Sequence, residues 1–309
     1  MADSASVIQT PQILPRSEFS TIAQARWWRG HLQGSEYAWA LAFCLPYVAL
    51  FFAFVVYPVG FGVWMGSDPA LYPRLFNDPI YWETVVNTAL FLGIAINVKL
   101  FLALLLSGFF MRRGWWVKAL LMVFVLPWAV PALPTYISIH WMLNGEWGLV
   151  NNLLWHLFGI NGPDWLTERW MALGCVMVSH VWKWLPFWTV ILLAGRMAIP
   201  SEIQEAARVD GATGFRMFVH VNFPLIANLY FICTLLSTIF SLGDFNVVTF
   251  VSGGGPADST HVLATLGIRY AFDIAQPRLG VAAVISALPL LIPLVIMLMR
   301  KFKTSQVQL

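Results

Sequence analysis

Six long apolar stretches are the feature that most constrains how this sequence can fold. A helix rises about 1.5 Å per residue, so about 20 apolar residues cross the roughly 30 Å hydrocarbon core of a bilayer. Only 11% of the chain is charged, against about 25% in a typical soluble domain. The sequence therefore predicts an all-α membrane protein with six transmembrane helices: Ala38–Trp64, Val85–Phe110, Ala119–Leu143, Met171–Ala194, Leu225–Phe250 and Leu279–Met299.

The connections between these stretches carry very different numbers of basic residues, and cytoplasmic loops collect Lys and Arg. The N-terminal tail, the second and fourth connections and the C-terminus are basic, whereas the other connections hold four arginines. We therefore expect both termini to be cytoplasmic. The residues on the basic side are Arg16, Arg26, Arg29, Arg112, Arg113, Lys118, Arg196, Arg208, Arg216, Arg300, Lys301 and Lys303.

The rest of the chain offers no second folded unit. We expect a cytoplasmic tail at residues 1–37, one transmembrane domain at 38–303 and a short tail at 304–309. Cys44, Cys175 and Cys233 lie apart in apolar stretches, and no C-x-x-C or H-x-x-x-H spacing occurs. The sequence predicts neither a disulfide framework nor a metal site.

One polar stretch, "EAARVDGATGFRMFVHVNFP" at residues 205–224, interrupts the apolar pattern between the fourth and fifth spans. Ser201 and Gln204 have the spacing of a capping box, which predicts a helix from about Glu202. Asp210 and Gly211 should stop that helix, because glycine takes a left-handed cap at the least cost. A second helical stretch is predicted from about Thr213 to Val219.

The same stretch combines small residues with large apolar ones on the side predicted to face the cytosol. Ala206, Ala207 and Ala212 would let another backbone come close, whereas Phe215 and Phe218 are large apolar groups. An exposed apolar element usually has a protein or a membrane to cover it. Docking to a cytoplasmic partner and a helix resting in the membrane interface are about equally compatible with these residues.

The order of residues in this stretch resembles the EAA loop of ABC importer permeases. "WKWLPFWTVILLAGRMAIPSEI" before it resembles the fourth span of carbohydrate-uptake permeases, and "FNVVTFVSGGGP" resembles their loop after the fifth span. The resemblance covers about residues 37–303 and points to the permease type similar to maltose and glycerol-3-phosphate subunits. The matching residues are Glu205, Ala206, Ala207, Asp210, Gly211, Ala212, Phe218, Val221 and Pro224.

The resemblance implies a type I ABC importer permease fold in which the loop at 196–224 forms a coupling helix seated on a cytoplasmic ATPase. Glu205 would be the polar contact to the ATPase, Gly211 the required bend, and Ala206 and Ala207 would permit close seating. It also implies a second homologous permease, two ATPase copies and a periplasmic or tethered solute-binding protein. The chain departs from the family pattern at three positions outside that coupling core. Val221 fills the hydrophobic position where isoleucine is usual, Asn228 stands where a second proline is frequent, and Asn246 stands where an aspartate is often found.

The sequence contains no G-K pair, so a phosphate-binding loop of the G-x-x-x-x-G-K-[ST] type is excluded. The "SGGGP" segment at residues 252–256 is predicted to be a turn. None of the six histidines stands in a catalytic or metal-binding spacing. We therefore expect a transport subunit without a cofactor or metal, which moves a sugar, polyol or related hydroxylated solute through the inner membrane while a partner hydrolyses ATP. The alternatives are an importer of a phosphorylated polyol such as glycerol phosphate, and an ATP-independent channel or membrane enzyme.

Three ionisable residues lie at membrane depth, where a charge is costly and usually faces a cavity or a partner. Lys99 is about eight residues from the predicted cytoplasmic end of its span, so we expect its side chain to snorkel. Lys183 is deeper and stands between two tryptophans. It is a candidate for contact with the solute, and pairing with a helix carbonyl or with Asp244 is as compatible with its position.

The third predicted span contains three prolines in "LPWAVPALP" at residues 126–134. Proline removes a backbone donor, and the freed carbonyls must be satisfied inside protein or beside water. This is typical of a span that lines a passage, so Tyr136 and Trp141 join Lys183 and Asp244 as candidate cavity residues. Plain packing between helices is the alternative for the aromatic pair.

Overall fold

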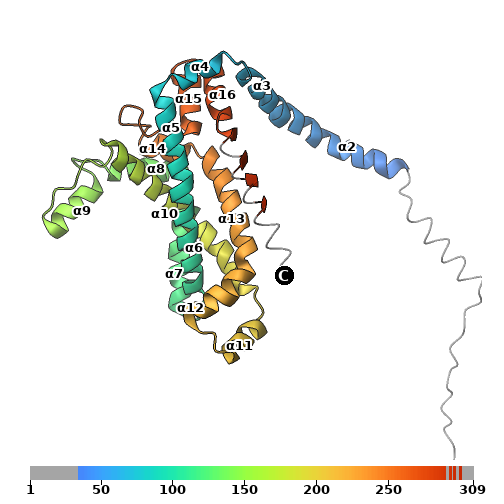
Figure 1. Ribbon diagram of the computed structural model, residues 1–309, viewed down its shortest axis with the longest axis vertical. Helices are drawn as coiled ribbons and strands as arrows, with labels where there is room; N and C mark the ends of the chain where they lie inside the picture. The colour runs from blue at the N-terminus through green and yellow to red at the C-terminus, as the bar shows by residue number, and fades with distance from the viewer. Residues whose placement is uncertain (1–33, 290–291, 294, 297–298, 301–309) are drawn as a thin grey trace, which may run out of the picture. The chain divides into compact units, whose positions relative to one another are not determined.

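The computed structural model describes residues 34–289, 292–293, 295–296 and 299–300, which form helices and connecting turns without a strand (Figure 1). The chain divides into two units, with the boundary between Gly62 and Val63. The described part of the first unit is helical throughout. It comprises α2 (Gly34–Phe51), the π-helical segment η1 (Phe52–Val56) and the first residues of α3 (Tyr57–Gly66). Trp39–Gly66 is apolar around the whole helix and long enough to span a membrane.

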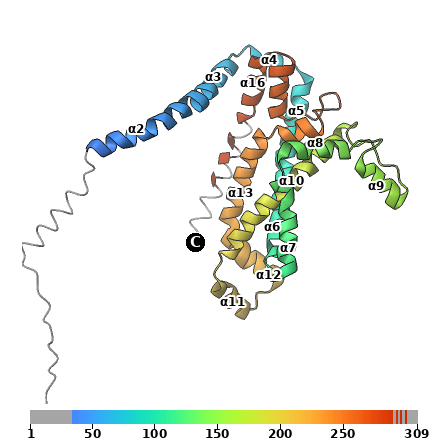
Figure 2. The ribbon, with the colours of Figure 1, turned by 180° about the vertical axis from the view of Figure 1, so that it is seen from behind.

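Three long helices form the framework of the second unit, and Figures 1 and 2 both show them side by side. They consist of α5 (Pro79–Leu90), η2 (Phe91–Ala95) and α6 (Ile96–Phe110); α10 (Arg169–Met197); and α12 (Gly214–Met217), η3 (Phe218–Asn222) and α13 (Phe223–Gly243). Their shared core buries Leu92, Ile96, Leu100, Ala103, Leu104, Trp188, Leu192, Ile226 and Cys233.

Local sequence explains where the first of these helices begins. Asp78 is the N-cap of α5, and its carboxylate accepts a hydrogen bond from the backbone N–H of Ile80 at 2.9 Å. Pro79 follows at the first helical position, where its missing N–H costs nothing. The helix then runs without a break to Phe110, which confirms the second predicted span and starts it earlier.

The third predicted span, Ala119–Leu143, is wrong as a single straight helix. The structure contains α7 (Trp115–Ala129) and α8 (Ala132–Met142), and the two are bent by 94°. Val130 is extended, with ψ of 140°, as the residue before a proline prefers, and Pro131 cannot continue the hydrogen-bond ladder. The prolines therefore break this span rather than merely loosening it.

The fifth predicted span, Leu225–Phe250, is also broken. α13 ends at Gly243, and Asp244 leaves the helical conformation with ψ of 92°. One oxygen of the Asp244 carboxylate accepts a hydrogen bond from the backbone N–H of Asn246 at 3.1 Å, so the side chain supports the start of α14 (Asn246–Val251). The short polar side chain competes with the helix for backbone donors, and that effect outweighs the apolar sequence around it.

By length and composition, the described residues contain four helices that could cross a membrane, or five if the bent pair counts as one span. The sixth predicted span, Leu279–Met299, begins in α16 (Pro277–Ile285) and continues into residues outside the described ones. Figures 1 and 2 place α11 at one end of the second unit and α4 at the other. The remaining elements are α4 (Leu71–Phe76), α9 (Leu149–Phe158), α11 (Ser201–Val209), α15 (Leu263–Ile268) and η4 (Arg269–Asp273).

Candidate functional site

The segment between α10 and α13 forms a short helix, a tight turn and a second helix. α11 begins at Ser201, one residue before the predicted start. The predicted capping box is wrong, because Pro200 occupies the N-cap and no side chain caps the helix. Ser201 therefore lies inside the first turn, where its hydroxyl cannot act as an N-cap acceptor.

The turn after α11 has the hydrogen bonds of a Schellman motif. Gly211 has φ of +81°, its N–H donates to Arg208 O at 3.0 Å, and the N–H of Ala212 donates to Ala207 O at 2.9 Å. A Cβ at Gly211 would meet no atom within 4 Å, so the backbone conformation selects glycine rather than a lack of space. The predicted stop at Asp210 and Gly211 is confirmed.

α11 exposes both polar and apolar side chains. Glu205, Ala206, Asp210 and Gly211 are exposed. Val209 is 88% exposed and Phe215, in the following helix, is 79% exposed. A cleft of about 150 Å³ lies beside the turn and is lined by Asp210, Gly211, Ala212, Arg216 and His220.

The second predicted helix of this segment is present but does not end near Val219. It continues as one helix from Gly214 to Gly243. Phe218 is partly buried and packs against the shared core of α6, α10 and α13, whereas Pro224 is exposed on the same helix. One end of the polar loop is therefore part of a rigid span.

A buried polar cluster joins α6, α10 and α13. Lys99 Nζ lies 2.9 Å from His180 Nε2, and His180 Nδ1 lies 3.4 Å from Asp244 Oδ2. Ser241 Oγ also reaches His180 Nε2, at 3.2 Å. Lys99 is 1% exposed, so the expectation that it snorkels is wrong. Its ammonium points into the bundle, where the imidazole of His180 accepts its hydrogen bond.

Sequence reasoning missed His180, because it looked for spacing within one segment. Lys99, His180 and Asp244 belong to three different predicted spans. Polar residues at a similar depth in three spans could have predicted a buried polar cluster. The cluster encloses a cavity of about 10 Å³, close to the size of one water molecule. Its lining includes Trp184 and Ser237, whose polar atoms have no hydrogen-bond partner among the described residues.

Lys183 is 3% exposed and contacts the backbone between α7 and α8, where the span is bent. Its ammonium donates to Pro127 O at 2.8 Å and to Val130 O. These carbonyls lie where α7 ends and lack helical donors, because the residues four positions further on are Pro131 and Pro134, which have no N–H. From the sequence, Lys183 is a candidate for contact with the solute, with Asp244 or with helix carbonyls. In the structure it pairs with helix carbonyls.

The other candidate cavity residues lie in different surroundings. Tyr136 is fully buried in a core that includes Phe91, Val176 and Val247. Trp141 is half exposed and stacks on Trp147 with ring centroids 5.0 Å apart. Of the four candidates, Asp244 lines the small cavity, whereas Tyr136, Trp141 and Lys183 do not. The structure therefore does not bring the four together.

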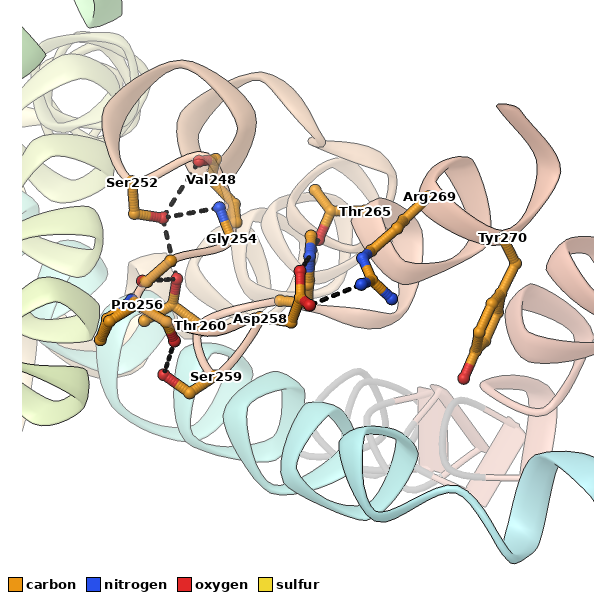
Figure 3. Close-up of polar contacts among 12 residues, drawn as sticks. Val248, Ser252, Gly254, Pro256, Asp258, Ser259, Thr260, Thr265, Arg269 and Tyr270 are labelled. Atoms are coloured by element: carbon orange, nitrogen blue, oxygen red, sulfur yellow. Dashed lines mark hydrogen bonds and ion pairs between the residues drawn. The ribbon is translucent and has the colours of Figure 1, made fainter. Parts of the chain in front are cut away.

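The glycine-rich segment after α14 forms a braced turn, as predicted. Gly253 and Gly254 have φ of +64° and +80°. Ser252 Oγ lies 2.9 Å from Thr260 Oγ1 and accepts a hydrogen bond from Gly254 N at 3.3 Å (Figure 3). Arg269 donates to Asp258 Oδ2 at 2.5 Å and ties the turn to η4.

His261 lies at the base of this turn and is nearly buried. Its Nδ1 lies 3.1 Å from Thr265 Oγ1, and its Nε2 lies 3.3 Å from Asp258 Oδ1. Burial lowers the pKa of His261 below its ordinary value of 6.5, and the Asp258 carboxylate opposes part of that effect.

The sequence is similar to those of known transport system permease proteins, and the fold is similar to that of a solved ABC transporter. The trehalose/maltose transport system permease protein MalF of Thermococcus litoralis is 32% identical over 160 residues, which are 52% of this chain and 54% of that protein. The sulfoquinovosyl glycerol transport system permease protein SmoG of Agrobacterium fabrum is 33% identical over 45% of each chain. A bacterial ABC transporter involved in the import of the acidic polysaccharide alginate has the same fold, with a TM-score of 0.76 and 21% identity over 90% of this chain and 99% of that chain.

The chain spans about half the length of the curated relatives named above. A family pattern nevertheless matches residues 99–303, which include most of α6, all of α10, the whole polar loop and the buried cluster. That family is described as "Binding-protein-dependent transport system inner membrane component". This chain belongs to the family of inner membrane components of binding-protein-dependent transport systems.

Proposed function

We propose that this chain is one permease subunit of an ATP-driven importer that moves a sugar, polyol or related hydroxylated solute across the inner membrane. In this proposal it has six transmembrane helices with both termini in the cytoplasm. It pairs with a second homologous permease, two copies of an ATPase and a solute-binding protein.

The observation that carries the proposal is the geometry of the loop at 196–224. α11 presents Glu205 and Ala206 to solvent, together with Val209, which is 88% exposed. An exposed apolar side chain beside small residues suits a groove on another protein. We assign the ATPase contact to Glu205, Ala206, Ala207, Asp210, Gly211 and Ala212, with Phe218 and Pro224 joining the loop to its span.

The loop is connected to the membrane region in a way that can transmit movement. The helix that starts at Gly214 is unbroken to Gly243, where Asp244 joins the buried cluster. A displacement of α11 would therefore reach the middle of the bundle through one rigid element. Closing and opening of the ATPase pair would in this way alternate access to the passage.

The passage itself is proposed to lie along the two broken helices. Transporters commonly place solute sites where spanning helices are discontinuous. α7 breaks at Val130 and Pro131, α13 breaks at Asp244, and α8 and α14 pack together in the core around Tyr136. We propose that Lys183 and Asp244 act at these breaks, Lys183 by holding the open end of α7 rather than by meeting the solute in this state. Tyr136 and Trp141 lie further along α8 and are proposed to line the passage there.

The geometry favours a neutral solute over a phosphorylated one. An anionic group would be held at membrane depth by a cation that has spare hydrogen-bond donors facing it. Lys183 is engaged by two carbonyls, and Lys99 is buried against His180. Neither lysine is presented to a phosphate in this structure.

Affinity purification from the native membrane tests the proposal. We expect a P-loop ATPase and a second permease to be recovered with this chain, and one solute-loaded binding protein to raise ATP hydrolysis by the complex. Mass spectrometry would identify the partners, and the solute that stimulates hydrolysis would name the cargo. Recovery of this chain alone, with transport or catalysis in vesicles that contain nothing else, would refute the proposal.

A further inference from the structure

The last turn of α10 carries a buried arginine that contacts two other elements. Arg196 is 6% exposed, and its Nη2 donates to Leu104 O in α6 at 2.9 Å. The same guanidinium lies over the ring of Phe218 in η3, 5.2 Å from the ring centroid. One side chain of α10 therefore joins α6 to the segment that follows the α11 turn.

The surface of α6 is shaped to receive this guanidinium. Gly108 lies one turn beyond Leu104, and a Cβ at position 108 would come within 3.2 Å of Arg196 Nη1. A contact of that length is tight, and the guanidinium would have to give by a few tenths of an ångström. The absence of a side chain at 108 thus lets the guanidinium reach the backbone of α6 and bind a carbonyl directly.

Phe218 connects the Arg196 guanidinium to the loop and to the shared core. Its ring packs on the shared core of α6, α10 and α13 and lies 5.9 Å from the ring of Phe223 and 6.3 Å from that of the exposed Phe215. A cation over an aromatic face gains more when both are removed from water. Any movement of the loop must either carry Arg196 and α6 with it or break a desolvated contact.

We propose that Arg196 is a positioning residue that couples movement of the loop at 196–224 to α6. This inference rests on the proposed function, because it concerns the loop that would move with the ATPase. A side chain that only closed the end of α10 would bind the last carbonyls of its own helix. Arg196 instead binds the backbone of one neighbouring helix and the ring of another.

The test uses the complete importer in proteoliposomes and measures solute taken up per ATP hydrolysed. We expect Arg196→Met to lower that ratio about fivefold or more while the ATPase still co-purifies, since coupling between sites typically amounts to at least this much. Arg196→Lys should restore part of the ratio, because an ammonium can donate to Leu104 O but cannot stack as a plane. The matched control is Arg112→Met, since Arg112 is exposed, lies just after α6, and its guanidinium carbon is 5.3 Å from the ring centroid of Phe109.

A second variant keeps the test decisive if Arg196→Met does not assemble. Gly108→Ala adds one methyl group against the guanidinium and should lower the ratio in the same direction, with normal assembly. Combined with Arg196→Met it should have no further effect, because the methyl group would have no guanidinium to displace. A normal ratio in both single variants would overturn the inference and leave the proposed function intact. Failure of the wild-type chain to bind an ATPase would refute the proposed function itself.

Discussion

Lys99→Met tests whether the buried polar cluster contributes to stability. In the wild-type chain the ammonium of Lys99 lies 2.9 Å from His180 Nε2, and the other ring nitrogen lies 3.4 Å from the Asp244 carboxylate. With a proton on Nδ1, a neutral imidazole accepts a hydrogen bond from the cation at Nε2, and its Nδ1 lies within ion-pair distance of the anion without a hydrogen bond to it. Methionine keeps most of the volume of lysine, so the variant removes the charge and leaves little empty space.

The expected cost follows from the charge that remains. Removing one partner of a buried ion pair destabilises a protein by about 3–5 kcal/mol, because the other charge is left without compensation. Here His180 separates the two charges, so we expect the low end, about 3 kcal/mol. Asp244→Asn should cost a similar amount, because it also removes one of the two charges. The amide oxygen can still accept the hydrogen bond from Asn246 N, so the loss of that bond adds no further cost.

The double variant distinguishes this account from general damage to the core. With both charges removed, Lys99→Met with Asp244→Asn should be more stable than the sum of the single effects predicts, by at least about 1 kcal/mol. The measurement is the free energy of unfolding from a denaturant titration in mixed micelles, with exposed Lys118→Met as a control expected within about 0.5 kcal/mol of wild type. Single variants as stable as wild type, or strictly additive effects, would refute the coupling of Lys99 and Asp244 through His180.

Three further outcomes are expected. Gly211→Pro should abolish transport with normal insertion, measured as uptake against membrane abundance, because proline cannot adopt the positive φ or donate the turn's hydrogen bond; Gly211→Ala, which only strains φ, should retain part of the activity. The lowered pKa of His261 means that stability should fall as the pH drops through about 6.5, since the unfolded chain then binds the proton more readily; a midpoint of thermal unfolding with the same pH dependence in His261→Gln would contradict this. Tyr270→Phe should lower the free energy of unfolding by about 1–2 kcal/mol, because the Asp78 carboxylate loses the phenol that donates to it at 2.5 Å; an unchanged unfolding curve would show that water replaces the phenol.

The features that the sequence predicted correctly depend on residues close together in the chain. The apolar stretches predicted long helices, and the Asp210–Gly211 pair predicted the turn that ends α11. Each follows from composition or from the conformational preference of one residue. The predicted capping box was wrong for a local reason as well: Pro200, the residue before Ser201, occupies the N-cap itself.

The features that were missed depend on contacts between distant segments. Lys99 and His180 are 81 residues apart, and Arg196 and Leu104 are 92 residues apart. Hydropathy assigns each residue a depth along its helix but no rotation about it, and rotation decides whether a cation faces lipid or a neighbour.

Three cations at helical positions are satisfied in three different ways, and the comparison indicates what holds this bundle in register. Lys99 is accepted by an imidazole, Lys183 by the open carbonyls of a broken helix, and Arg196 by a carbonyl of an intact one. In each case the acceptor lies on another helix, so sliding or rotating either helix would leave a charge unpaired where water is scarce. Apolar packing alone tolerates such shifts, since lipid is as apolar as the helix surfaces. The charges therefore define which helices move together, and Arg196, next to the polar loop, is the one whose contacts the loop can disturb first.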